Sequence, residues 1–540
     1  MSRQASDRPE DEGRPAFEAV CEAMGDPAFY PHPMSRVERR DTHISAVFLT
    51  GEVVYKVKKP VDLGFLDFRR LEDRRTACMR EDLLNRRLSR DVYRGVVPIH
   101  MDPSGAVSLE TCGPVVEYAV TMRQLPDAAN LKALLAAGAA GREHVARIGR
   151  RLAGFYGACE RSPAIDAHGG LDAIACNMEE NFRQLAPWAG RILEASRWEF
   201  LCEANRAFLT HHAGAFARRV DEGRIRDGHG DLRTDHVYFD GGLQIIDCIE
   251  FNDRFRFGDA AADIAFLVMD LAALGHADLG RDLLAAYAAA ADDPGVFAVV
   301  DFYVVYRAVV RIKVACLRLS SADAAEREVL ASEIDRHMDL AYRHTLLFGR
   351  PTLWVCCGVP ASGKSSLAGR LGKVLGIRVF GSDIVRKETA PDAAVSPYGR
   401  GAYSPERRSL VYGRLLALAQ DELRSGRSAV LDATYALRRW RDGVRRLAED
   451  MDASLVFAVC ACARKTLSRR LTRREQAPPG PSDARIGHLD PLLAEFEDIE
   501  ELPKDQVVHV DTDGPREENL VRVLTEGCAR RASQIARRLR

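Results

Sequence analysis

The stretch Gly-Val-Pro-Ala-Ser-Gly-Lys-Ser-Ser, at residues 358–366, decides the fold of the C-terminal half of this chain. It follows Thr-Leu-Trp-Val-Cys-Cys at 352–357, an apolar run typical of a buried strand. It leads into residues 366–375, where leucines recur at helical spacing. A strand, a glycine loop and a helix form the context that the pattern G-x-x-x-x-G-K-[ST] requires, so we expect a phosphate site rather than a chance glycine turn.

The chemistry of that site follows from its residue types. Glycines let the backbone N–H groups point inward at phosphate oxygens, and the start of the helix presents positive charge to the same anion. Lys364 would place a point charge on the β and γ phosphates of ATP, and the Ser365 hydroxyl would be a Mg²⁺ ligand. The ATP-binding residues predicted from this loop are Gly358, Ala361, Ser362, Gly363, Lys364, Ser365 and Ser366.

The length and composition of the chain limit its class. With 540 residues it is too long for one core, so we expect several domains. Its hydrophobic content of 46% and charged content of 29% are those of an ordinary soluble protein. The formal net charge of −1 gives the chain no general attraction to nucleic acid or to a membrane surface.

Three features predict where the protein works. The thirteen cysteines show no zinc-ligand spacing, which favours reduced thiols in the cytoplasm. The first ten residues lack the apolar core of a signal peptide. The apolar run at 296–317 is interrupted by Asp301, Arg307 and other charges, so it predicts a buried helix and not a membrane span. We therefore expect a cytoplasmic protein without a membrane partner.

The second half of the chain alternates between strand and helix patterns. The predicted strands are residues 352–357, 377–381, 428–431, 454–460 and 506–510. Such alternation is typical of a doubly wound, mostly parallel sheet. In that fold the carboxyl ends of the strands face the glycine loop, which is where the chemistry is expected.

Two aspartates follow predicted strands at that edge. Asp383 ends the second strand of this half and is a candidate base, although a helix N-cap is the alternative for it. Asp432 ends the third strand and is a candidate Mg²⁺ ligand. Residues 464–474 place arginines along one helix before the proline-rich run 478–481. We interpret them as a lid over the phosphate site, with an ordinary solvated basic face as the alternative.

These motifs resemble the small P-loop kinases of the zeta-toxin and polynucleotide-kinase group, over roughly 352–515. The resemblance implies that Asp383 activates the acceptor hydroxyl and that Arg386 holds phosphate. It also implies a lid made of Arg470 and Arg474, which would contact ATP, followed by Ser-Asp-Ala at 482–484.

The N-terminal half begins with a different pattern. Residues 45–57 predict two strands joined at Thr50–Glu52, with Lys56 and Lys58 on one face of the second strand. The charged stretch 69–88 predicts a helix that contains Glu81. Further strands are expected at 93–99 and 115–122, and helices from 130 to 224. A sheet with a lysine followed by a helix with a glutamate is typical of a kinase small lobe; the alternative is a surface lysine in a hairpin.

Two aspartates mark the predicted chemistry of this half. Asp231 lies in His-Gly-Asp at 229–231, and Asp247 follows sixteen residues later, each beside a short apolar strand. A hairpin would bring them together, one to orient an acceptor hydroxyl and one to hold Mg²⁺ against phosphates. Without a metal the two charges would repel, so we expect one of them to take up a proton. Asp259 and Asp263 either support this loop or cap the next helix.

The same residues resemble the aminoglycoside phosphotransferase and choline kinase-like group, within the protein kinase-like fold, over roughly 20–345. The resemblance implies a catalytic role for Asp231, metal binding by Asp247, and a phosphate-pairing Lys56 held by Glu81. The group usually has Asn five residues after the catalytic Asp, where this chain has His236. A neutral imidazole can bind metal, although Mg²⁺ prefers oxygen.

The order of the two halves resembles a family of fused bacterial proteins, aminoglycoside phosphotransferase-like and then ATP-binding. We divide the chain into a disordered tail at 1–14, a kinase-like domain at 15–348, a P-loop domain at 349–520 and a basic helix at 521–540. The boundary falls at Gly-Arg-Pro, residues 349–351, which interrupts the helical pattern.

We interpret the chain as two phosphotransferase-type domains that use ATP and Mg²⁺ on a small-molecule or nucleotide-like substrate. Two alternatives stay open. The N-terminal half could be a non-catalytic regulator of a P-loop ATPase, as His236 suggests. The P-loop half could act on nucleic-acid ends through the arginines at 464–474 and in the C-terminal tail, but no aromatic residues alternate with them to stack bases. The motifs specify neither the acceptor nor an oligomeric state.

Overall fold

The computed structural model describes residues 14–34, 36–111, 113–319, 322–389, 404–476 and 484–539. The predicted disordered tail, up to residue 13, lies outside these residues, as do the proline-rich run and residues 482–483 of the predicted lid. The chain forms two compact units. The first contains Met1–His144, Phe155–His168 and Ile225–Asp263, and the second contains Val145–Gly154, Gly169–Arg224 and Ile264–Arg540. The predicted domain boundaries stay predictions.

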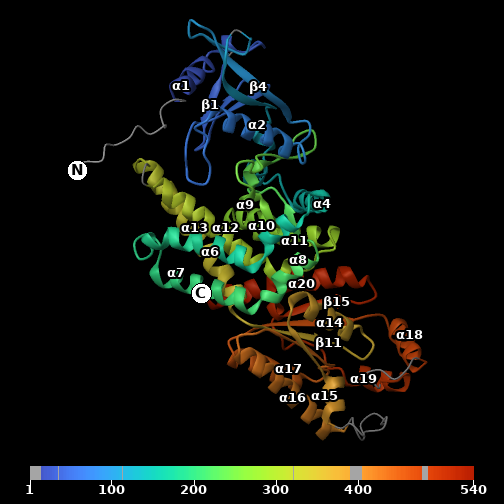
Figure 1. Cartoon of the computed structure of the whole chain (residues 1–540). Helices are drawn as coiled ribbons and strands as arrows, with labels where there is room; N and C mark the ends of the chain where they lie inside the picture. The colour runs from blue at the N-terminus through green and yellow to red at the C-terminus, as the bar shows by residue number, and fades with distance from the viewer. Residues whose placement is uncertain are drawn as a thin grey trace. The chain divides into compact units, whose positions relative to one another are not determined.

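The first unit begins with helix α1 (Arg14–Ala23) and a six-stranded sheet in the order β1-β2-β3-β6-β4-β5, whose strand pairs are all antiparallel. Helix α2 (Leu71–Asn85) packs on β6 and β4, as Figure 1 shows in blue. The strands are β1 Glu38–Asp41, β2 Ser45–Leu49, β3 Val53–Lys58, β4 Tyr93–Met101, β5 Val107–Ser108 and β6 Val115–Arg123. The predicted hairpin, helix and later strands are confirmed.

Strand β3 is buried on both of its faces, and the two faces differ in chemistry. Tyr55 and Val57 belong to the same apolar cluster as Phe17 of α1. The alternate residues Lys56 and Lys58 are also buried, although each carries an ammonium group. Because side chains alternate along a strand, both lysines lie on the face opposite to that apolar cluster.

Two short hairpin-like pairs position the predicted catalytic aspartates. Strand β8 (Val237–Phe239) pairs antiparallel with β9 (Leu243–Ile245), and β7 (Ile225–Asp227) pairs antiparallel with β10 (Phe257–Asp259). Asp231 precedes β8 and Asp247 follows β9. The hairpin expected between the two aspartates is therefore present.

Helices make up most of the rest of the N-terminal two thirds of the chain. Helices α12 and α13 lie side by side over most of their length (Figure 1). Among the residues that the structure describes, no helix is long and apolar enough to cross a membrane. The helices are α3 Leu131–Ala136, α4 Arg142–Ala158, α5 Pro163–Asp166, α6 Leu171–Leu185, α7 Ala195–His211, α8 Ala213–Asp221, α9 Asp253–Arg256, α10 Ala260–Ala273, α11 Ala277–Ala290, α12 Val296–Arg318 and α13 Ala324–Gly349.

The C-terminal part of the second unit contains a five-stranded sheet in the order β12-β13-β11-β14-β15, with every pair parallel. The strands are β11 Thr352–Cys357, β12 Arg378–Gly381, β13 Ala429–Asp432, β14 Ser454–Ala461 and β15 Val507–Asp511. The helices are α14 Lys364–Leu375, α15 Ser382–Thr389, α16 Pro405–Arg424, α17 Arg438–Asp450, α18 Arg464–Glu475, α19 Leu489–Glu495 and α20 Arg516–Arg538. The C-terminal helix predicted from residue 521 thus begins at Arg516.

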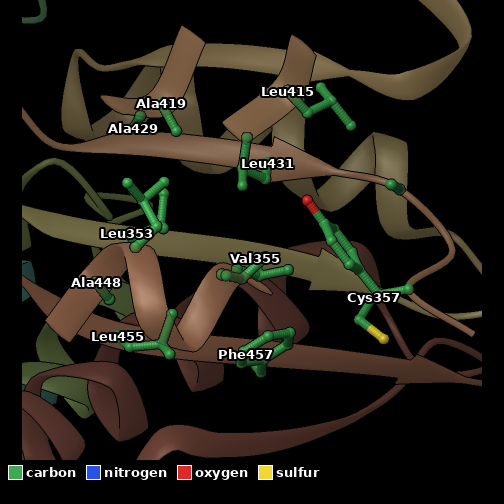
Figure 2. Packing of buried hydrophobic residues seen from close by; sticks show 14 of the residues in the cluster. Leu353, Val355, Cys357, Leu415, Ala419, Ala429, Leu431, Ala448, Leu455 and Phe457 are labelled. Atoms are coloured by element: carbon green, nitrogen blue, oxygen red, sulfur yellow. The ribbon is translucent and has the colours of Figure 1, made fainter. Parts of the chain in front are cut away.

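Helices cover this sheet on both faces, which makes it doubly wound. Leu353, Val355 and Cys357 of β11 pack with Leu415 of α16 and Phe457 of β14 in one buried cluster, shown in Figure 2. On the other face, α14 and α20 contact the sheet. The doubly wound parallel sheet predicted for the C-terminal half is therefore confirmed.

One close contact on that second face gives a stability prediction. Trp354 of β11 is 3% exposed, and a Cβ placed on Gly527 of α20 would lie 2.4 Å from its ring. Gly527→Ala should therefore overpack this face and destabilise the chain by about 1–3 kcal/mol, lowering the Tm measured by calorimetry. The matched control is Gly413→Ala in α16, where an added Cβ meets nothing within 4 Å. An unchanged Tm for Gly527→Ala would contradict the predicted tight packing.

Candidate nucleotide and phosphotransfer sites

The glycine loop after β11 adopts backbone angles that only some residues tolerate. Gly358 has φ 143, Ala361 has φ 66 and Gly363 has φ 94. A Cβ on Gly358 would lie 2.4 Å from the carbonyl oxygen of Cys460, so this position requires glycine. Helix α14 begins immediately after the loop, at Lys364. The predicted strand–loop–helix arrangement is present, with the start of the helix at the loop.

Two residues outside the loop hold its shape. The Thr512 hydroxyl, just after β15, donates to the Ser362 carbonyl at 2.5 Å. The Arg470 guanidinium donates to the Ala361 carbonyl at 3.0 Å and to the Thr512 carbonyl at 2.7 Å. The resemblance gave Arg470 a contact with ATP, whereas the structure directs two of its N–H groups to the backbone around the loop. Sequence analysis missed Thr512, which carries no motif.

A cavity of about 360 Å³ opens beside the loop. Lys364, Ser365 and Asp383 line it, so the structure brings the predicted phosphate and acceptor groups together. Five arginines also line it: Arg370, Arg470, Arg473, Arg474 and Arg516. Of these, only Arg470 and Arg474 were predicted. This concentration of positive charge suits a polyanionic ligand such as a nucleoside triphosphate.

The two predicted acceptor-side residues form a pair. Arg386 donates to the Asp383 carboxylate at 3.0 Å, and the Arg386 side chain is 9% exposed. Asp383 is the second residue of α15, so it lies inside the helix rather than at its N-cap. The carboxylate therefore lines the cavity in a fixed orientation, which a general base requires.

Asp432 and Ser365 fit a metal ion. Burial raises the pKa of Asp432, although Lys364 and a hydrogen bond from Ser365 act in the opposite direction. Its Oδ1 atom is buried without a hydrogen-bond partner in the part of the chain that the structure describes. An unsatisfied carboxylate oxygen beside a serine hydroxyl is the oxygen-rich environment that Mg²⁺ prefers.

In the first unit, Lys56 connects three elements. Its Nζ donates to Glu81 Oε1 of α2 at 2.8 Å and to Asp247 Oδ1 at 2.6 Å. Burial acts to lower the pKa of Lys56, but Asp247 and Glu81 outweigh it, and the pKa is raised well above its usual value. The alternative of a surface lysine in a hairpin is wrong, because the Lys56 side chain is only 10% exposed.

His236 lies between the two aspartates. Its Nδ1 is 3.7 Å from Asp231 Oδ2, and its Nε2 is 3.5 Å from Asp247 Oδ2. Nδ1 also lies 2.7 Å from the Asp231 carbonyl oxygen, and Nε2 lies 3.1 Å from an Arg233 nitrogen. Because Arg233 can only donate, Nε2 accepts, and the proton of a neutral imidazole is on Nδ1. The single Nε2 lone pair is thus directed to Arg233, and a metal ion beside Asp247 would have to replace that hydrogen bond.

Both aspartates keep their charge. Burial acts to raise the pKa of Asp247, but Lys56 and His236 lower it well below its usual value. Burial has the same effect on Asp231, where Arg233 and His236 outweigh it and the pKa is also lowered. The expectation that one of the pair takes up a proton is wrong, because Lys56 beside Asp247 and Arg233 beside Asp231 already provide the positive charge that was expected from a metal.

The backbone around Asp231 is fixed by Asp263. Its carboxylate accepts from the backbone N–H of His229 at 2.6 Å and of Gly230 at 2.8 Å, and from the Tyr156 hydroxyl at 3.2 Å. Of the two roles considered for it, Asp263 therefore supports the loop. Asp259 instead accepts from the N–H of Ala261, at the start of α10.

Among the described residues, no group of three or more His, Cys, Asp or Glu side chains is arranged to hold a metal by itself. Mg²⁺ commonly uses one or two carboxylates together with substrate phosphates. Asp247 with His236, and Asp432 with Ser365, fit that kind of partial site. The phosphates of a bound nucleotide would supply further ligands to Mg²⁺ at each site.

These features define the class of the protein. The chain joins a protein kinase-like fold to a P-loop domain, two folds that are found in phosphotransferases in general. The family model AAA_33, described as an AAA domain, matches residues 353–499. That match includes the glycine loop, Asp383 and Asp432.

The chain also matches whole proteins. It is 33% identical over 514 residues to "Uncharacterized protein Rv2004c" of Mycobacterium tuberculosis H37Rv and to "Uncharacterized protein Mb2027c" of Mycobacterium bovis. Each match covers 94% of this chain and 97% of the relative. The chain therefore belongs to the family of these mycobacterial proteins, and the match extends over nearly the whole length of each.

Solved structures resemble each half separately. An ethanolamine kinase of Plasmodium vivax is 10% identical with a TM-score of 0.37, covering 64% of this chain and 95% of that one. A gluconokinase of Sinorhizobium meliloti 1021 is 22% identical with a TM-score of 0.27, covering 36% of this chain and 99% of that one. Likenesses of this size carry no argument about the substrate of this chain.

Proposed function

We propose that the protein is an ATP-dependent phosphotransferase whose P-loop domain transfers the γ-phosphoryl group of ATP to a hydroxyl group. The observation that carries this proposal is the single cavity lined by Lys364 and Ser365 of the glycine loop and by Asp383 of α15. Phosphoryl transfer needs a held triphosphate and an oriented acceptor in one place, and this cavity provides side chains for both.

The proposed step assigns a role to each group. Lys364 and the loop N–H groups hold the β and γ phosphates, and Ser365 with Asp432 would hold Mg²⁺, which neutralises charge on the phosphates when bound. Asp383 accepts the proton of the acceptor hydroxyl, whose oxygen forms a bond to the γ phosphorus. The bond from that phosphorus to the bridging oxygen breaks, and ADP leaves.

For the N-terminal half we propose a second phosphotransferase site, acting on a hydroxylated small molecule. Asp231 would orient the acceptor hydroxyl, Asp247 would bind Mg²⁺, and Lys56 would bind phosphate. A non-catalytic regulatory role is the second candidate, and the observation that favours it is His236 in a position where the similar group has Asn.

The proposed setting is the cytoplasm, with a small-molecule or nucleotide-like acceptor for the P-loop domain. Every cysteine that the structure describes is a free thiol, which supports a reducing compartment. A nucleic-acid end is the alternative acceptor. The arginines that line the nucleotide cavity support the small-molecule proposal, because their charge is directed to the triphosphate site rather than spread along an extended surface.

The first prediction concerns ATP affinity of the full chain. Lys364→Ala removes the ammonium group of the glycine loop and should weaken ATP binding at the P-loop site roughly 10- to 100-fold, measured by calorimetry. The matched control is Lys373→Ala, on the same helix, whose side chain does not line this cavity. Equal affinities for the two variants would refute the assignment of Lys364.

The second prediction separates binding from transfer. Asp383→Asn keeps the shape of the side chain and removes its proton-accepting charge, so ATP affinity should be nearly unchanged. Phosphate transfer to a panel of hydroxylated metabolites, nucleosides and oligonucleotides should fall by about 10²- to 10⁴-fold. Asp421→Asn, at an exposed position of α16, is the control. If Asp383→Asn weakens ATP binding as much as transfer, its role is structural.

The third prediction tests the N-terminal half in the full chain, with Lys364→Ala present to weaken the P-loop site. Adding Asp247→Ala should weaken the remaining Mg²⁺–ATP binding at least about tenfold, because the variant loses the carboxylate that would bind Mg²⁺ and that contacts Lys56. Asp278→Ala, at an exposed position of α11, is the control. Adding Asp231→Ala should abolish transfer and leave binding. If the chain with Lys364→Ala binds Mg²⁺–ATP but transfers no phosphate, and Asp231→Ala changes nothing, the regulatory candidate is correct.

A further inference from the structure

A second lysine is buried beside Lys56 and has no place in the proposed chemistry. Lys58 follows on the same face of β3, and its side chain is 0% exposed. Its Nζ donates to Glu81 Oε2 at 2.5 Å and also to Glu250. Glu81 is likewise 0% exposed, so the two oxygens of one buried carboxylate each bind a different lysine.

The five side chains form one continuous series of ion pairs. It runs from Asp247 to Lys56, Glu81, Lys58 and finally Glu250. Its two ends, Asp247 and Glu250, are three residues apart in the segment after β9. The series therefore leaves this segment, crosses β3 and α2, and returns to the segment. Removal of one member would leave an uncompensated buried charge on its neighbour.

Helix α2 has further contacts with the same segment. The Asn85 side chain accepts from the Cys248 backbone N–H at 2.8 Å and donates to the Glu81 carbonyl at 2.9 Å. Arg87, just after the helix, donates to the Cys248 Sγ atom at 3.4 Å. The end of the helix that carries Glu81 is thus held against the segment that carries Asp247 by contacts with Cys248.

Binding of a nucleotide would change some of the contacts within this series of ion pairs. In the proposed site, binding of Mg²⁺ by Asp247 would draw that carboxylate away from its 2.6 Å contact with Lys56, whose ammonium group could then donate to phosphate. Lys56 would then keep only its contact with Glu81. Nothing in that exchange involves Lys58 or Glu250, so their contacts with Glu81 and with the 247–250 segment stay in place.

We propose that Lys58 and Glu250 are positioning residues of the N-terminal phosphotransfer site, holding Glu81 and Asp247 in place while Lys56 moves from Asp247 to phosphate. This inference rests on the proposed function of the N-terminal half. A purely structural role would affect only the stability of the fold. A positioning role predicts that loss of the pair weakens Mg²⁺–ATP binding even in a chain that still folds.

The chain contains a matched control pair. Arg74 of α2 and Glu117 of β6 form a buried ion pair at 2.8 Å, with side chains 3% and 1% exposed. The pair joins the same helix to the same sheet but is not part of the series of ion pairs that contains Lys56 and Asp247. The variant Arg74→Met/Glu117→Gln therefore measures what loss of a buried pair does to stability alone.

The test uses the full chain with Lys364→Ala, and its readouts are the Tm and the Kd for Mg²⁺–ATP. Lys58→Met/Glu250→Gln removes both partners of one pair but leaves Glu81 with Lys56 as its only cation, so we expect its Tm to lie below that of the control pair. We expect Mg²⁺–ATP to bind this variant about 10- to 100-fold more weakly than the control pair. Glu250→Gln alone keeps Lys58 paired with Glu81 and should also weaken Mg²⁺–ATP binding. This single variant replaces the double variant as the test if the double variant does not fold.

The outcomes are distinguishable. If the Lys58→Met/Glu250→Gln chain folds and binds Mg²⁺–ATP as well as the control pair does, the positioning role is overturned and the proposed function stands. If the Lys364→Ala chain itself binds no Mg²⁺–ATP, the proposed function of the N-terminal half fails, and the inference fails with it.

Discussion

The first unit depends on the neutralisation of Glu81, a carboxylate without exposure to solvent. Transferring such a charge from water costs several kcal/mol unless cations and hydrogen bonds compensate for it. Two ammonium groups from one strand provide that compensation, Lys56 on one oxygen and Lys58 on the other. Strand β3 and helix α2 therefore cannot separate without exposing a bare charge, and the position of Asp247 follows from theirs.

The two candidate sites differ in how their charged side chains are paired. Around Lys56, carboxylates and ammonium groups alternate, so each cation is already occupied before a nucleotide arrives. Around Lys364, five arginines share one cavity with few acids. The P-loop cavity thus presents an excess of positive charge to a polyanion, whereas in the proposed N-terminal site Asp247 would have to leave Lys56 before it could bind a metal ion.

Local patterns predicted most of the fold. The glycine loop, the strands of the parallel sheet and the β2–β3 hairpin follow from spacing and apolar runs, and the structure confirms them. The pairing of Lys56 with Glu81 was suggested by resemblance. Contacts made by folding could not be predicted: Thr512 on the loop backbone, Arg470 turned toward carbonyls, and Glu250 on Lys58. Each joins residues at least 42 positions apart, and no local pattern encodes such a contact.

The backbone at Asp247 has φ 65, in the left-handed region that β-branched residues avoid. This backbone angle limits which residues can replace Asp247. Glycine, asparagine and aspartate tolerate it at little cost, whereas valine or isoleucine would strain the segment that also carries Glu250. Asn or Gly could therefore replace Asp247 without straining the backbone, so the fold of this segment does not by itself require a carboxylate here.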